Sequence, residues 1–365
     1  MKSNYKKLAP YIRLVDIRNT NDERYELLGV SVDKHFIKSI ANTVGTDWRT
    51  YKVIKKGQFC YIPDTSRRGD KMGIALLLGY DIALVSQAYA VFEIINQDEL
   101  LPEYLNLWFK RPEFDRYARF HSHGSVREIF DWEEMGNVEL PIPDIEEQKK
   151  IVEAYNTIER RIELKRQIND NLESQAYTYY QDKIADKDKD STLSELAIIT
   201  MGTSPDGESF NDVGNGVVFY QGRTDFGFRF PTIRLYTTEP KRFAEKNDIL
   251  MSVRAPVGDI NIAKEYCAIG RGLASLRPKD GCYSFLYYTL KQLNQELQRF
   301  NDDGTVFGSI TKDDLFALKI VSLTAEERQQ FETKISPIDA VIKNNEMEIA
   351  NLELACSLLL SRLAN

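Results

Sequence analysis

The chain has 365 residues, with 48 Lys and Arg against 55 Asp and Glu and a formal net charge of −7. This length allows two domains, each with its own core, and a content of 42% hydrophobic and 28% charged residues excludes disordered and fibrous proteins. The acidic balance excludes a protein that coats nucleic acid through bulk positive charge, so any contact with DNA has to come from local patches.

Cysteine spacing and hydropathy predict a cytoplasmic protein. The four cysteines form no CxxC pair, which argues against a zinc ribbon and against a dense disulfide framework. Charged residues interrupt the apolar stretch near the N-terminus before it reaches signal-peptide length. The longest uncharged apolar-rich run, 82–92, is too short to span a membrane. We therefore expect no membrane partner.

Residues 1–144 are predicted to form a mixed domain of short strands and a few helices, because short apolar runs alternate with turn sequences. The segment Tyr61-Ile-Pro-Asp-Thr-Ser-Arg-Arg-Gly-Asp-Lys71 concentrates cations beside turns. Arginine can read guanine with two hydrogen bonds, and loop glycines let the backbone approach phosphates. The residues predicted here to contact DNA are Ser66, Arg67, Arg68 and Lys71. Taken alone, the segment also fits a solvated loop with structural salt bridges.

Residues 145–190 are predicted to form a long helix followed by a charged linker. Pro141 and Pro143 close the preceding domain, and apolar residues then recur at heptad spacing. The predicted seam positions are Ile151, Tyr155, Ile158, Ile162, Lys165, Asn169 and Leu172. Such a pattern favours a coiled coil. The alternative is an amphipathic helix packed on its own domain.

Residues 191–323 show the same mixture of short apolar runs and turns as 1–144. Cations gather in Tyr220-Gln-Gly-Arg-Thr-Asp-Phe-Gly-Phe-Arg-Phe-Pro-Thr-Ile-Arg234, with Ser252-Val-Arg-Ala-Pro-Val-Gly-Asp259 and Gly270-Arg-Gly272 behind it. Glutamine can read adenine as arginine reads guanine. The residues predicted to contact DNA in this domain are Gln221, Arg223, Arg229 and Arg254.

Residues 324–365 are predicted to form a second long helix, which a capping box of Thr324 and Glu327 opens. Its predicted seam positions are Phe331, Ile335, Ile338, Ile342, Asn345, Ile349 and Leu352. Together the two helical segments hold 13 basic and 18 acidic residues and so account for five of the seven net negative charges. Each predicted mixed domain is therefore close to neutral.

The second half of the chain repeats the first. A shift of 180 residues aligns Gly124-Ser-Val126 with Gly304-Thr-Val306, and Asn171-Leu-Glu173 with Asn351-Leu-Glu353. The same shift makes Lys165 equivalent to Asn345, so polar residues meet in one central layer if the helices pair. The fold class predicted is α+β: two globular mixed α/β domains separated by a long antiparallel two-helix coiled coil, with an internal pseudo-twofold repeat.

Common catalytic motifs are missing from the sequence. There is no GxxxxGK[ST] phosphate loop, GxGxxG, HExxH, GxSxG or Asn-Pro-Pro-Tyr type element. His121-Ser-His123 places two imidazoles two residues apart, but no third ligand accompanies them, so we expect no metal site. The sequence therefore predicts a protein without catalytic residues of its own.

The sequence resembles the specificity subunit of type I restriction-modification systems over essentially its whole length. The resemblance is carried by Asp64-Thr-Ser-Arg-Arg-Gly-Asp-Lys-Met-Gly73, Gly222-Arg-Thr-Asp-Phe-Gly-Phe-Arg-Phe-Pro231, Ser252-Val-Arg-Ala-Pro-Val-Gly-Asp259 and the junction Leu140-Pro-Ile-Pro-Asp-Ile-Glu-Glu-Gln-Lys-Lys-Ile151. The second junction departs from the family pattern, because Val321-Ser-Leu-Thr324 lacks both prolines.

This resemblance implies a non-catalytic, sequence-specific subunit that reads a bipartite, asymmetric target in double-stranded DNA, one half per recognition domain. It implies two modification subunits as partners, which bind S-adenosylmethionine and methylate adenine, so that the chain itself needs no cofactor. Restriction subunits with motor and nuclease activity are further implied partners. The acidic helices then predict that the chain alone holds DNA weakly.

Two other classes of function remain open from the sequence. One is a DNA nuclease or a self-contained DNA methyltransferase with its own recognition domains. The other is a coiled-coil adaptor whose globular domains do not touch DNA.

Overall fold

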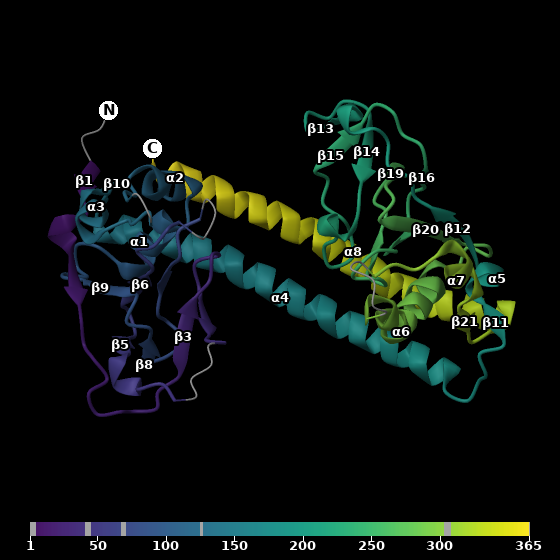
Figure 1. Cartoon of the computed structure of the whole chain (residues 1–365), viewed down its shortest axis with the longest axis horizontal. Coiled ribbons are helices and arrows are strands. Elements are labelled where there is room, and N and C mark those ends of the chain that lie inside the picture. Colours follow the sequence, from purple (N-terminus) through teal and green to yellow (C-terminus); the bar gives the residue numbers. More distant parts are fainter. Residues whose placement is uncertain (1–4, 41–44, 67–70, 125–126, 303–307, 365) are drawn as a thin grey trace. The chain divides into compact units, whose positions relative to one another are not determined.

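The computed structural model describes residues 5–40, 45–66, 71–124, 127–302 and 308–364. The predicted DNA contacts Arg67 and Arg68 lie outside these ranges. The chain divides into two compact units, one formed by Met1–Glu163 with Asn351–Asn365 and the other by Leu164–Ala350. Each unit contains globular sheets and part of both long helices, α4 (Ile145–Ile184) and α8 (Ala325–Arg362) (Figure 1).

The first unit is built on one antiparallel sheet, one mixed sheet and short helices. One sheet has the order β2-β9-β6-β7 and the other β4-β3-β8-β5. The strands are β1 (Tyr5–Lys7), β2 (Ile12–Val15), β3 (Leu27–Val30), β4 (Phe36–Lys38), β5 (Lys52–Lys55), β6 (Phe59–Tyr61), β7 (Ile74–Leu76), β8 (Ile82–Val85), β9 (Ala90–Ile94) and β10 (Glu139–Pro141). The helices are α1 (Pro102–Phe109), α2 (Pro112–Phe120) and α3 (Trp132–Asn137), with short 3₁₀ turns at Ala9–Tyr11 and Trp48–Thr50.

The second unit repeats this plan, with sheet orders β12-β20-β17-β18 and β13-β15-β14-β19-β16. Its strands are β11 (Ser191–Thr192), β12 (Ala197–Met201), β13 (Phe210–Asn211), β14 (Val217–Tyr220), β15 (Leu235–Thr237), β16 (Phe243–Ala244), β17 (Ile249–Ser252), β18 (Ile260–Ile262), β19 (Cys267–Ile269), β20 (Leu273–Pro278) and β21 (Lys319–Ile320). The helices are α5 (Leu193–Leu196), α6 (Tyr283–Asp302) and α7 (Lys312–Ala317), with 3₁₀ turns at Gly207–Ser209 and Arg223–Asp225.

Strand pairing confirms the internal repeat. The parallel pair β3 with β8 matches the parallel pair β14 with β19, and the antiparallel partners on either side also correspond. The small pair β1 with β10 matches β11 with β21. The second unit adds β13 at one sheet edge. Both halves of the chain therefore fold by the same topology.

Each unit has an apolar core between its two sheets. In the first unit Leu28 and Ile54 of one sheet pack against Cys60 and Val91 of the other, and in the second Val218 and Cys267 belong to the equivalent cluster. Short apolar strands bounded by turns thus form two-layered sheets, because their inward residues lose water only when the layers pack together.

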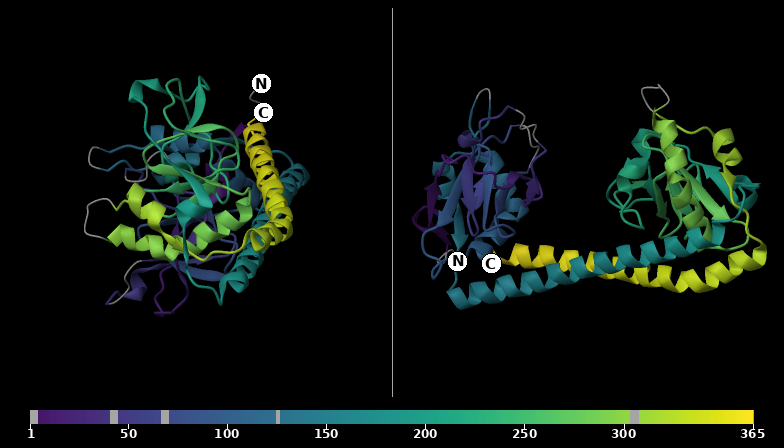
Figure 2. Two further views of the ribbon diagram at one scale, coloured as in Figure 1. Left: turned by 90° about the vertical axis from the view of Figure 1, so that its right-hand side faces the viewer. Right: turned by 90° about the horizontal axis from the view of Figure 1, so that it is seen from below.

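The long helices pair antiparallel within the second unit, as predicted. Tyr179 of α4 stacks on Phe331 of α8 with ring centroids 5.7 Å apart, whereas Lys165, two heptads earlier, contacts Asn345, two heptads later. Figure 2 shows the two helices alongside one another. In the first unit, Cys356 of α8 lies beside Glu159 of α4.

The heptad positions of the two helices fall into two seams, which are not equally buried. In one seam every position is at most 7% exposed; its residues are Tyr155, Ile162, Asn169, Ala176, Ile335, Ile342, Ile349, Cys356 and Leu363. In the other seam Ile151, Ile158, Lys165, Leu172, Ile338 and Leu352 are only partly buried, whereas Phe331 and Asn345 are buried. Phe331 and Ile335 also join the globular core of the second unit. The helices therefore combine coiled-coil pairing with packing on their own domain.

Polar side chains meet in the predicted layer between the helices. Lys165 Nζ donates to Asn345 Oδ1 at 2.8 Å, and Asn345 Nδ2 donates to Asn169 Oδ1 at 2.8 Å. Asn169 Nδ2 donates in turn to Glu346 Oε1 at 2.9 Å, and Lys165 also pairs with Glu348 at 2.8 Å. Because sliding one helix would leave these buried groups without partners, the layer fixes the register.

Both long helices begin at satisfied N-termini. Asp144 Oδ1 accepts from the amide of Glu147 at 2.9 Å. At α8, Glu327 accepts from the Thr324 amide at 2.8 Å and the Thr324 hydroxyl accepts from the Glu327 amide, which confirms the predicted capping box. Lys187 and the Thr324 amide together hold the pKa of Glu327 at about 2.

The two domain-to-helix junctions attach a long helix to its globular domain through different side chains. Buried Gln148 donates to the carbonyls of Glu99 and Pro143 and accepts from the Leu101 amide, which joins α4 to the start of α1. At the repeat-equivalent position, Arg328 donates to the Leu323 carbonyl and pairs with Asp280. The second junction therefore lacks the family prolines but keeps the connection.

The helices of the described residues are all too polar or too short to cross a membrane.

Removal of the central amide of the polar layer should destabilise the helix pair. Asn345→Ala removes one hydrogen-bond partner each of Lys165 and Asn169 inside the seam, and we expect a loss of about 1–3 kcal/mol in unfolding free energy. Urea denaturation measures it. Met347→Ala on the same helix, where the side chain is 51% exposed, is the control and should change little; an equal loss in both variants would contradict a role for the layer.

Candidate DNA-contact surfaces

The loop between β6 and β7 carries Ser66 and Lys71 of the first predicted contact segment. A short backbone ladder supports it, because Thr65 N donates to Glu128 O at 2.9 Å and Phe130 N donates to Pro63 O at 2.9 Å. Ser66 is exposed, and its hydroxyl donates to Asp64 Oδ1 at 2.6 Å. The loop thus presents short polar side chains on a fixed backbone.

The loop between β17 and β18 is the true counterpart of that loop in the second unit. Ala255 N donates to Gly308 O at 2.8 Å, and Ile310 N donates to Val253 O at 3.1 Å. Gly308 and Ile310 lie 180 residues after Glu128 and Phe130, so the same ladder supports both loops. Exposed Arg254 lies in this loop. The segment 220–234, by contrast, connects β14 to β15 and corresponds to the β3–β4 connection.

Lys71 borders a groove of about 920 Å³ in the first unit. The groove is also lined by Lys110, Arg116 and Arg119, and Phe120 beside them is 80% exposed. Lys71 pairs with Asp33 at 2.9 Å and Arg119 with Glu128 at 2.8 Å. Exposed pairs of this kind are weak and can exchange for phosphate.

The sequence reasoning missed Arg119 and Phe120, although a signal was present. The dipeptide Arg-Phe recurs 180 residues later as Arg299 and Phe300. The exposed ring of Phe120 next to a cation is hard to explain by packing within the first domain, because exposure of a phenyl ring to water is unfavourable.

In the second unit, Gln221 and Arg223 lie next to the β17–β18 loop. Arg223 Nε lies 2.9 Å from Asp259 Oδ2 at the end of that loop. Gly272 approaches Gln221 so closely that a Cβ there would lie 2.7 Å from the Gln221 carbonyl oxygen. Val253 N donates to Gly272 O at 2.9 Å. The exposed predicted residues Gln221, Arg223 and Arg254 therefore belong to one connected surface.

Arg271 is a further cation on that surface that the sequence reasoning did not select. It is exposed and sits between Gly270 and Gly272, and both glycines pack against the backbone of Gln221. The flanking glycines were the available signal, since they permit the close approach that brings Arg271 next to the predicted contacts.

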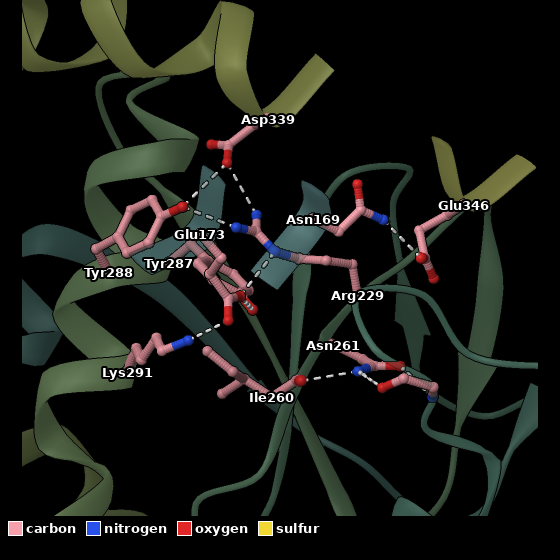
Figure 3. Close-up of polar contacts among 11 residues, drawn as sticks. Asn169, Glu173, Arg229, Ile260, Asn261, Tyr287, Tyr288, Lys291, Asp339 and Glu346 are labelled. Carbon is pink, nitrogen blue, oxygen red and sulfur yellow. Dashed lines mark hydrogen bonds and ion pairs between the residues drawn. The ribbon is translucent and has the colours of Figure 1, made fainter. Parts of the chain in front are cut away.

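Arg229 is the prediction that the structure corrects. Its side chain is 1% exposed, so it cannot reach DNA without unpacking the domain. Nε donates to Glu173 at 3.0 Å, Nη1 to Asp339 at 2.9 Å and Nη2 to the hydroxyl of Tyr288 at 2.7 Å (Figure 3). The guanidinium also lies over the ring of Tyr287, 4.1 Å from its centroid. Arg229 is a buried structural cation.

We define the Arg229 cluster as Arg229 with Glu173, Asp339, Tyr287, Tyr288 and Lys291. The electrostatics of this cluster favour the charged forms of Arg229 and Glu173. Burial alone raises the pKa of Glu173, but Arg229 and Lys291 more than offset it, and the pKa lies below its ordinary value of 4.5. The tyrosine rings and the two carboxylates likewise raise the pKa of Arg229 despite its burial. Both charges therefore persist at neutral pH.

The loop that carries Arg229 is fixed on its other side by the sheet. Asn261 of β18 donates through Nδ2 to Gly227 O at 3.0 Å and accepts from Gly227 N at 3.1 Å. Ile262 N donates to Arg229 O at 2.8 Å, and Thr232 N donates to Asp225 O at 2.8 Å.

Arg229→Met should destabilise the second unit and alter its acid sensitivity. It leaves Glu173 and Asp339 with one cation fewer, and breaking one partner of a buried pair costs about 3–5 kcal/mol. Because the folded pKa of Glu173 is depressed, its contribution is present above pH 4.5 and is lost as pH falls through the folded pKa.

Urea midpoints measured at pH 7 and pH 4 test this prediction. The wild-type chain should lose more stability between the two values than Arg229→Met does. Equal losses would show that Arg229 does not hold Glu173 in its ionised form.

Clusters of three or more His, Cys, Asp or Glu able to hold a metal ion are absent from the described part of the chain. His121 instead pairs with Glu134 at 3.2 Å and stacks on Tyr117 with ring centroids 4.2 Å apart. The four cysteines are buried free thiols.

Comparison with known proteins gives a consistent family assignment. The family described as type I restriction modification DNA specificity domain matches the chain twice, over residues 7–174 and 186–354. A relative from Methanocaldococcus jannaschii, a putative type I restriction enzyme MjaX specificity subunit, is 30% identical over 287 residues, which cover 71% of this chain and 66% of that protein. The match thus spans slightly less than two thirds of that relative.

Two further comparisons concern a second relative and a solved structure. The HindI specificity subunit of Haemophilus influenzae is 28% identical over 41% of this chain and 32% of its own length. The crystal structure of the S subunit of a type I restriction-modification system from M. genitalium, 16% identical, superposes with a TM-score of 0.60 over 99% of this chain and 96% of that one. That structure shows the same fold.

The two family matches together cover most of the chain, and each spans one globular domain and most of one long helix. The chain therefore belongs to the family of specificity subunits of type I restriction-modification systems.

Proposed function

We propose that this chain reads a bipartite, asymmetric target in double-stranded DNA, with one half of the target read by each recognition domain. The recognition domains correspond to residues 1–144 and 191–323, and the helical segments to 145–190 and 324–365. The observation that carries the proposal is the presence of two equivalent loops, β6–β7 and β17–β18, on the same backbone ladder in two copies of one fold.

Different side chains on these equivalent loops support an asymmetric target. The first loop has Asp64, Thr65 and exposed Ser66 where the second has exposed Arg254, Ala255 and Pro256. A carboxylate or hydroxyl and a guanidinium offer different hydrogen bonds to base edges. Two copies with the same loop chemistry would favour a palindrome, whereas these two copies favour unlike half-sites.

The long helices offer apolar surface for protein partners. On α4, Leu164 and Ile168 are 52% and 46% exposed in the second unit, and on α8, Leu354 and Leu358 are 59% and 54% exposed in the first. Residues four apart share one helix face, so each unit presents one exposed apolar pair. Paired apolar residues on a solvent-facing side favour a docking site.

We assign these surfaces to two modification subunits, which would bind S-adenosylmethionine and methylate adenine, in the cytoplasm and with restriction subunits as additional partners. The chain alone should then hold DNA weakly, because the acidic long helices repel phosphates and partner subunits would supply much of the positive surface.

Mapping of methylated adenines tests the bipartite target. In cells that express the chain with its modification subunit, we expect methylation at one motif made of two unlike specific halves around an unspecified spacer. Methylation at one continuous motif, or none above the level without this chain, would contradict the proposal. Methyl transfer or cleavage by the purified chain alone would favour the alternative of an enzyme.

Loop variants should act on the half of the target that their own domain reads. Lys71→Ala and the double variant Gln221→Ala with Arg223→Ala should each weaken DNA binding by the reconstituted complex. Each lost phosphate contact should reduce the slope of log binding constant against log salt concentration by about one. A gel shift at several salt concentrations measures both effects. Lys149→Ala on exposed α4 is the matched charge control, and an equal effect of that variant would exclude a specific role for the loops.

Charged substitutions on the exposed apolar pairs should weaken partner docking without affecting the fold. Leu354→Lys with Leu358→Lys should reduce the number of modification subunits bound per chain from two to one, as measured by light scattering of the purified complex. The same pair of changes at Leu164 and Ile168 should do likewise. Full occupancy in both variants would support the alternative of partners bound elsewhere.

A further inference from the structure

We propose that Arg229 is a positioning residue that fixes the second recognition domain at one angle on the helix pair and thereby restricts the spacer length that the protein accepts between its half-sites. The inference rests on the proposed function above, since it concerns the geometry with which that DNA is read. Its basis is the Arg229 cluster (Figure 3).

The guanidinium joins three elements to one recognition loop. Glu173 belongs to α4, Asp339 to α8 and Tyr288 to α6, whereas Arg229 itself lies between the 3₁₀ turn Arg223–Asp225 and β15. A planar guanidinium with fixed donor directions can satisfy two carboxylates only in a narrow range of orientations. The loop and the two helices are therefore held in one relative position.

That constraint reaches the exposed residues of the same loop. Six positions separate Arg229 from Arg223, which faces the β17–β18 loop through Asp259. Both Asn261 and the Ile262 amide fasten the segment between them to the sheet. A shift of the Arg229 side chain would therefore tilt the whole exposed surface that carries Arg223.

The domain has other attachments that do not depend on Arg229. Glu332 of α8 accepts from the amides of Ser284 and Phe285 at the start of α6, at 2.9 and 3.3 Å. Tyr177 of α4 donates to Gln292 at 2.7 Å. Removal of Arg229 should therefore loosen the angle of the domain and its loop without releasing the domain from the helices.

The first unit has a buried cation at the equivalent connection, but its described contacts lie within the globular domain. Lys34, between β3 and β4, is 6% exposed, pairs with Asp115 of α2 at 2.8 Å and donates to the carbonyl of Phe109. Glu159, the sequence equivalent of Asp339, lines the open groove of about 920 Å³ with Lys34.

In the second unit Arg229 and Asp339 line a pocket of about 280 Å³ and pair with each other at 2.9 Å. In the second unit the Arg229–Asp339 ion pair links the recognition loop to α8, whereas in the first unit Lys34 and Glu159 line an open groove. The two domains differ in how firmly this point is attached, which makes Lys34 the natural control for Arg229.

Spacer discrimination by the reconstituted methyltransferase tests the proposal. The substrates are duplexes that carry the mapped target with its native spacer or with one base pair added or removed, and the readout is the ratio of kcat/KM between native and altered spacers. Arg229→Met should reduce this ratio about tenfold or more, which corresponds to about 1.4 kcal/mol of discrimination between the two spacers. Arg229→Lys should fall between the wild type and Arg229→Met.

Lys34→Met removes a buried cation from the first domain and should leave the ratio unchanged, even where it lowers the melting temperature as much as Arg229→Met does. Glu173→Gln, which retains the pair with Asp339, should reduce the ratio less than Arg229→Met. A uniform loss of activity on all spacers, or an equal loss of discrimination in Lys34→Met, would overturn the proposal and leave Arg229 with a purely structural role.

Hydrogen exchange of the full chain without DNA or partners separates this inference from the proposed function. Arg229→Met should speed exchange about tenfold in 226–234 relative to the wild type, whereas the β6–β7 loop should not change. Unchanged exchange in 226–234 would overturn the anchoring role even in a methylating complex. If instead the wild-type complex fails to methylate while exchange responds as expected, the proposed function fails and the anchor stands.

Discussion

The register of the two long helices is the constraint on which the rest of the second unit depends. Lys165, Asn169 and Asn345 satisfy one another across the seam, so the helices cannot slide without burying unpaired polar groups. Glu173 lies one turn from Asn169, and Asp339 lies less than two turns from Asn345. A slip of one turn would move either carboxylate by about 5.4 Å and out of reach of Arg229. The polar layer therefore determines where a recognition loop can attach.

Two copies of one topology meet this constraint with different residues. Gln148 joins the first helix to its domain through amide hydrogen bonds, whereas Arg328 with Asp280 does so in the second. Lys34 pairs inside its own domain, whereas Arg229 pairs with the helices. Conservation of geometry without conservation of side chains is expected where the requirement is only that a buried donor finds an acceptor. It leaves the recognition loops free to differ while the frame stays the same.

Much of this architecture could be predicted from the sequence, and the failures have identifiable physical causes. Heptad spacing, the capping box at Thr324 and the polar layer are local or repeat-based signals, and each matches the structure. The buried role of Arg229 was missed because its partners lie 56 and 110 residues away in the sequence; an arginine among aromatics and glycines looks the same whether it faces a phosphate or a distant carboxylate. Pro337 shows the converse, since it lies inside a continuous α8 although proline disfavours helix interiors; buried Ile335 and Ile342 on either side hold the helix against its partner.

The long separation in sequence between partners in the seam has a consequence for synthesis of the protein. Lys165 and Asn345 are 180 residues apart, and Tyr5 of the first strand donates to the carbonyl of Ala364, the penultimate residue. At about 5–20 residues per second, the ribosome needs about 10–40 seconds between the two helices. During that interval α4 has no α8 beside it, so the nascent chain carries apolar seam residues such as Ile162 without the helix that later pairs with them.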